Sequence, residues 1–99
     1  MTVRIVAAAE RELREAIDQY NEQRPGLGFE FAVAVRLAFD RIVDFPEAWP
    51  AFSRRTRRCL VGGFPYGVLY QHAGADTLVL AIMHLRRAPV RWKDRIRDA

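Results

Sequence analysis

Two helical patterns separated by a short break constrain the fold more than any other feature of this sequence. In the first pattern, apolar side chains recur at the i, i+3, i+4, i+7 spacing of one helical face, at Leu13, Ala16, Ile17 and Tyr20. The break follows at Pro25-Gly26-Leu27-Gly28, because proline and glycine interrupt a helix and favour a tight turn. The second pattern begins directly after it. The sequence therefore predicts a helical hairpin, with helices over about residues 8–22 and 28–44.

The second helix carries more apolar side chains than one packed face requires. Its main stripe consists of Phe31, Val35, Ala38 and Ile42. A further row at i+4 spacing consists of Phe29, Val33 and Leu37. An apolar arc of roughly 100° is enough to seat a helix on one core. The further row therefore indicates either a deeply buried helix or a second surface that a partner covers.

Four β-branched or apolar segments predict the strands of one sheet, at residues 2–6, 57–61, 66–72 and 77–84. Short turns join the last three, which favours an antiparallel meander. The first strand is expected at an edge, where strand 57–61 is a candidate neighbour. The order β-α-α-β-β-β predicts an α+β fold in which a helical hairpin packs on one face of a curved, mainly antiparallel sheet.

The chain is expected to form a single domain over residues 1–99, with a frayed helix or extended tail from about residue 90. A hydrophobic content of 51% excludes a disordered chain. No signal-peptide pattern is present, and no apolar stretch approaches the roughly 20 residues that a membrane span needs. Cys59 excludes a disulfide framework and is expected as an inward-facing, inert thiol. These features favour a cytoplasmic protein.

Positive charge gathers in the second half of the chain. Residues 1–50 hold 6 Arg against 9 acidic residues, a balance of −3, whereas residues 51–99 hold 9 Arg and 1 Lys against 3 acidic residues, a balance of +7. One cluster comprises Arg54, Arg55, Arg57 and Arg58, and another begins at Arg86 and Arg87. The planar arginine side chain suits bidentate contacts with phosphate and carboxylate. Such a surface attracts a nucleic acid or an acidic protein.

The end of the fourth strand is the one place where the residue types suggest chemistry. No metal site and no cofactor is predicted, because His72 and His84 have no Cys or carboxylate at ligand spacing. However, His84 and Arg86 are followed by Arg87 and Trp92. A general base, a phosphate-binding cation and a stacking ring would together suit metal-free RNA cleavage. The alternative is a basic surface patch beside a histidine that continues the strand.

Five segments, taken in order, carry a resemblance to a known family. They are Arg24-Pro25-Gly26-Leu27-Gly28, Phe45-Pro46-Glu47-Ala48-Trp49-Pro50, Arg57-Arg58-Cys59-Leu60-Val61, Phe64-Pro65-Tyr66-Gly67-Val68-Leu69-Tyr70 and Ile82-Met83-His84-Leu85-Arg86-Arg87. From about Val3 to Trp92 the chain resembles the RelE/ParE toxins of type II toxin–antitoxin systems, and most of all the ParE-like, plasmid-stabilization branch. The resemblance implies the predicted fold, a bacterial toxin and a hetero-oligomer with a cognate antitoxin. The antitoxin is then the implied occupant of the Phe29, Val33 and Leu37 row.

The two branches of this family imply different activities. RelE-like members cut messenger RNA on the ribosome without a metal, and they typically carry an arginine before the Leu-Val-Tyr pattern of the third strand. Gly67 stands at the matching position here, before Val68-Leu69-Tyr70. A glycine has no side chain to contact a phosphate. ParE-like members instead bind DNA gyrase and trap its cleaved-DNA state, so we expect a gyrase inhibitor without catalytic residues.

The target-binding surface implied by this resemblance consists of Arg86, Arg87 and Trp92, followed by Arg54, Arg55, Arg57 and Arg58. Two alternatives stay open. In the first, His84 and Arg86 catalyse ribosome-dependent cleavage of messenger RNA. In the second, the chain is a non-toxic member of the fold that binds its antitoxin and the operator complex.

Overall fold

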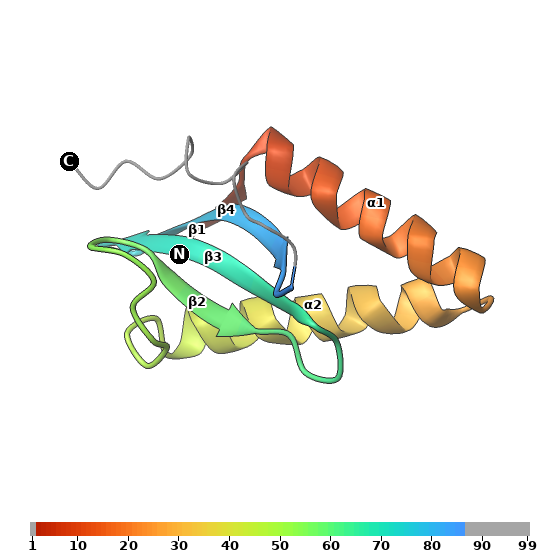
Figure 1. Ribbon diagram of the computed structural model, residues 1–99. Coiled ribbons are helices and arrows are strands. Elements are labelled where there is room, and N and C mark those ends of the chain that lie inside the picture. The colour runs from red at the N-terminus through yellow and green to blue at the C-terminus, as the bar shows by residue number, and fades with distance from the viewer. Residues whose placement is uncertain (1, 87–99) are drawn as a thin grey trace.

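The computed structural model describes residues 2–86, and it confirms the predicted α+β fold (Figure 1). The elements are β1 (Thr2–Ile5), α1 (Ala7–Gln23), α2 (Leu27–Asp44), β2 (Arg57–Leu60), β3 (Tyr66–Ala73) and β4 (Asp76–His84). Each lies within one residue of its predicted bounds. The expected tail from about residue 90 lies outside the described residues.

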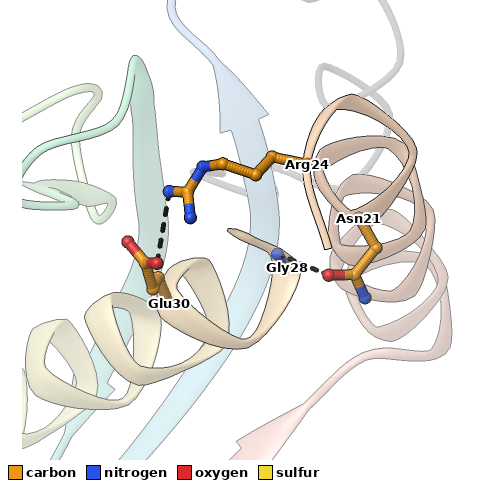
Figure 2. A network of polar contacts seen from close by, with 4 residues as sticks. All are labelled: Asn21, Arg24, Gly28 and Glu30. Atoms are coloured by element: carbon orange, nitrogen blue, oxygen red, sulfur yellow. Dashed lines mark hydrogen bonds and ion pairs between the residues drawn. The ribbon is translucent and has the colours of Figure 1, made fainter. Parts of the chain in front are cut away.

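The hairpin of α1 and α2 turns at Gly26, which adopts a φ of 90° in the left-handed region that favours glycine. Gly26 has no side chain to cap the first turn of α2. Asn21 of α1 supplies this cap instead, because its Oδ1 accepts a hydrogen bond from the Gly28 N–H at 2.8 Å (Figure 2). Arg24 also pairs with Glu30 at 3.2 Å. Contacts between the two helices therefore replace a local cap.

The sheet has the strand order β1-β4-β3-β2. β3 pairs antiparallel with β2 and β4, whereas β1 pairs parallel with β4. The edge position of β1 is confirmed, but strand 57–61 as its neighbour is wrong. The outer side of β2 is already occupied, since the Arg58 N–H donates to the Pro50 carbonyl at 3.0 Å. Directly after β1 the chain still lies beside β4, because the Val6 N–H donates to the Val79 carbonyl at 3.0 Å.

Both helices pack on one face of the sheet, which we call the helix face (Figure 1). The main core lies between the two helices and this face of the sheet. Rings from α1, α2, β3 and the loop before it form its centre, with centroids 4.9 to 6.1 Å apart, at Tyr20, Phe31, Phe64 and Tyr66. The opposite face, which we call the second face, carries a smaller buried cluster of Leu69, Leu80, Ala81 and Met83. The sheet is therefore apolar on both faces. Side chains alternate between the faces along the strands, except where the register of β3 with β4 shifts and the consecutive residues Leu80 and Ala81 join the same cluster.

Candidate functional site

The further apolar row of α2 lies on the surface. Phe29, Val33 and Leu37 are 71%, 43% and 52% exposed, whereas the main stripe of the helix is buried. The interpretation of α2 as a deeply buried helix is therefore wrong. One turn beyond Leu37, Arg41 donates to the Leu60 carbonyl at 2.9 Å and ties α2 to the edge of β2. The row is an apolar surface on a helix that the sheet holds in place.

His84 lies on the helix face, away from the second face to which Gly67 belongs. In the antiparallel register of β3 and β4, Tyr66 is paired with His84, and Gly67 with Met83. The His84 ring contacts the Tyr66 ring at a centroid distance of 5.1 Å and an interplanar angle of 78°. Its Nδ1 accepts a hydrogen bond from the Arg86 backbone N–H at 3.1 Å. Strand alternation thus places His84 and the Gly67 position, where RelE-like members typically carry an arginine, on opposite faces of the sheet.

The Arg58 side chain lies beside Gly67. A Cβ added to Gly67 would be 3.0 Å from Arg58 Cγ and 3.1 Å from Arg58 Cδ. The guanidinium carbon of Arg58 lies 5.8 Å from the centre of the Phe52 ring, within the range of a cation–π contact. The glycine therefore makes room for the stem of an arginine from β2, and Arg58 belongs to the second face.

The structure divides the cluster at residues 54–58 between two places. Arg54, Arg55 and Arg57 line a hollow at the start of β2 and the end of β3, which we call the basic hollow. Arg58 is not part of it. The other residues that line the hollow are Glu47, Ala51, Ser53, Thr56, Gln71, His72 and Ala73. Gln71 and His72 were missed at the sequence level, because only the pairing of β2 with β3 brings them beside these arginines.

Arg86 lies apart from the basic hollow. It follows β4, whose last residue pairs with Tyr66 at the start of β3, and its side chain is exposed. The hollow adjoins His72 at the other end of β3. A rise of about 3.3 Å per residue places these two ends roughly 20 Å apart. Arg87 and Trp92, which were expected beside Arg86, lie outside the described residues.

Two buried titratable groups serve the fold. Cys59 is 1% exposed, and burial raises the pKa of its thiol, an effect that Arg41 opposes in part. Because the thiolate is the reactive form, this environment favours the inert thiol expected from the sequence. The Tyr70 hydroxyl donates a hydrogen bond to the Pro46 carbonyl, and burial raises the pKa of Tyr70 to about 12. This bond anchors the segment after α2 to the centre of β3.

Within residues 2–86, no group of three or more His, Cys, Asp or Glu side chains could hold a metal ion. No helix in this part of the chain is long and apolar enough to cross a membrane. The described residues offer an exposed apolar row on α2 and arginines in two separate regions. These surfaces define a small α+β protein suited to contacts with other macromolecules.

Comparison with known proteins supplies the family. The family model described as "ParE toxin of type II toxin-antitoxin system, parDE" matches residues 3–89. The chain therefore belongs to the ParE toxin family. Among solved structures, it is similar to the "Chromosomal ParDE TA system from P. aeruginosa", with a TM-score of 0.66 and 15% sequence identity over 87% of this chain and 97% of that chain. No curated protein matches the sequence.

Proposed function

We propose that this chain inhibits DNA gyrase in the bacterial cytoplasm by binding to it, and that a cognate antitoxin neutralises it. Membership of the ParE toxin family supports both the role of this chain as a toxin and its neutralisation by an antitoxin. The observation that supports the binding mechanism is that His84 and the Gly67 position face opposite sides of the sheet, and that glycine brings no side chain to bind a phosphate. A toxin that traps an enzyme needs a complementary surface, and it needs no catalytic residues of its own.

The arrangement around His84 disfavours cleavage of RNA. A general base must come within about 3.2 Å of the atom whose proton it removes, with a cation at the same phosphate. The Nδ1 of His84 instead accepts the Arg86 backbone N–H, and its ring lies against Tyr66 on the helix face. Gly67 offers no side chain at the second face. Since loss of one stabilising donor typically slows a reaction by about 10²–10³-fold, a nuclease of this composition would be a poor one.

The row of Phe29, Val33 and Leu37 is the proposed antitoxin surface. Three apolar side chains at i+4 spacing give a continuous row, slightly inclined to the axis of α2, onto which an amphipathic segment can lay its own apolar face. The solved relative is described as a ParDE toxin–antitoxin system, which supports an antitoxin as the partner. Burying such a stripe contributes about 25 cal/mol for each Å² of apolar surface removed from water.

Expression of the toxin without its antitoxin tests the proposed activity in cells. Growth arrest with filamentation and DNA damage is expected, because a trapped gyrase leaves broken chromosomes. His84→Gln should stay toxic, whereas the double variant Arg86→Ala/Arg87→Ala should lose toxicity if these arginines contact the target. Growth arrest with cleaved messenger RNA and intact DNA would favour the nuclease. Unimpaired growth would favour the non-toxic alternative.

A further inference from the structure

We propose that the basic hollow is a binding site for the phosphates of a nucleic-acid backbone. This inference goes beyond gyrase inhibition, because it assigns to the toxin a direct contact with nucleic acid that needs no gyrase. Arg54, Arg55 and Arg57 line the hollow, and Glu47 is its single acidic side chain among the described residues. With the histidine neutral, the lining carries a net charge of +2.

A closed turn presents the two outer arginines. The N–H groups of Phe52 and Ser53 both donate to the Thr56 carbonyl, at 2.7 and 3.1 Å. Arg54 and Arg55 therefore occupy the tip of a tight loop, where their side chains are exposed. The buried Thr56 accepts a hydrogen bond from Gln71 Nε2 at 3.3 Å, which fastens the loop to β3.

The third arginine, Arg57, is held by the segment that follows α2. One guanidinium nitrogen of Arg57 donates to the Trp49 carbonyl at 2.8 Å, and the Trp49 indole N–H donates to the Arg41 carbonyl at 3.4 Å. The position of the Arg57 charge is thus fixed relative to α2. A site whose donors are already in place loses less side-chain entropy when it binds. Arginine also matches phosphate geometry better than a flexible lysine does.

The lining favours a nucleic acid over an acidic peptide. Among the described residues, Ala51 and Ala73 are the only apolar side chains of the hollow, so a peptide would find no pocket for an apolar anchor. Strand addition is also blocked here, since the outer edge of β2 already bonds to Pro50 and forms a bridge between Ala51 and Arg57. A nucleic-acid backbone needs neither an apolar pocket nor a free strand edge, because phosphate contacts supply most of the affinity in non-specific binding.

Fluorescence anisotropy of the full chain with a labelled DNA duplex of about 20 base pairs tests this proposal at several salt concentrations. Arg54→Ala/Arg55→Ala should weaken binding at least about 10-fold and lower the slope of log K against log salt by about 1 to 2. The control Arg11→Ala/Arg36→Ala removes the same charge from exposed sites on α1 and α2, and it should weaken binding less than about 3-fold. Glu47→Gln should tighten binding about 2-fold, because it removes the repulsive charge.

Three results would overturn the proposal. The wild type does not bind the duplex, the Arg54→Ala/Arg55→Ala variant binds it as well as the control does, or an oligoglutamate of equal charge binds more tightly than DNA. Circular dichroism confirms that each variant is folded. Since the assay contains no gyrase, a negative result here leaves the gyrase proposal standing, and a failure of the gyrase proposal leaves this one standing.

Discussion

Replacement of Gly28 by alanine tests the close approach of α1 and α2. A Cβ at this position would lie 2.3 Å from the Ile17 carbonyl oxygen and 2.6 Å from Asn21 Cγ. Favourable non-bonded contacts need about 3.5 Å. Because the Ile17 oxygen belongs to the backbone, no change of rotamer relieves this clash. The two helices must separate by about 1 Å at the turn of the hairpin.

The expected magnitude follows from opposing effects. Alanine favours a helix over glycine by about 1 kcal/mol. Overpacking of a close contact costs about 1–3 kcal/mol, and separating the helices also breaks the hydrogen bond between Asn21 and the Gly28 N–H, a loss of about 1 kcal/mol. We expect a net loss of about 1–3 kcal/mol in unfolding free energy. For a chain of this size, the melting temperature should fall by about 5–20 °C.

Thermal unfolding followed by circular dichroism measures this loss, and two variants serve as controls. Gly62→Ala should change stability by less than about 0.5 kcal/mol, because nothing lies within 4 Å of the added Cβ. Asn21→Ala should lose only the hydrogen bond, about 1 kcal/mol. A Gly28→Ala protein as stable as the wild type would refute the close packing from which the magnitude is derived.

Three further predictions concern the partner surface and the buried titratable groups. Leu37→Asp should weaken binding of the antitoxin by about 30-fold or more and leave the circular dichroism spectrum unchanged. Gln19→Asp on α1 should leave antitoxin binding unchanged. An unfolded Leu37→Asp protein would mean that the row is part of the core. The folded-state pKa of Tyr70 is about 12, against an ordinary value of 10. The contribution of the neutral Tyr70 hydroxyl to stability is therefore complete below pH 10. About 2–3 kcal/mol of stability is lost as the pH rises through 12. Urea unfolding across this interval should show that Tyr70→Phe removes this part of the alkaline loss, and an identical loss in both proteins would contradict the assignment. The thiol of Cys59 should react with an aromatic disulfide reagent slowly in the native protein and fast in denaturant, and fast native labelling would show that the thiol is accessible.

The elements of this fold could be predicted because each depends on a local pattern. The 3.6-residue spacing of α1 and α2 and the apolar strand segments fixed their bounds to within one residue. The pairing of β1 with β4 could not be predicted in this way. It joins residues far apart in the sequence, from Thr2 beside Asp76 to Ile5 beside Val79, for which no local pattern exists.

The residues of the candidate site could be predicted from the sequence, but their division between separate regions of the surface could not. The exposure of Phe29, Val33 and Leu37 follows from their excess over one helical stripe. Strand alternation separates Arg57 from Arg58, but the basic hollow also needs the loop before β2, whose irregular backbone carries no periodic signal. The separation of His84 from Gly67 depends on the register of β3 with β4, which only the structure supplies.

Incubation of the antitoxin-free toxin with DNA gyrase, ATP and supercoiled plasmid is the most direct test of gyrase inhibition by binding. The complexes are then denatured, and the plasmid is examined for linear DNA. We predict linear product that requires gyrase, that His84→Gln leaves unchanged, and that addition of the antitoxin prevents. No linear DNA and undisturbed supercoiling, at toxin concentrations that exceed those of gyrase, would contradict the claim.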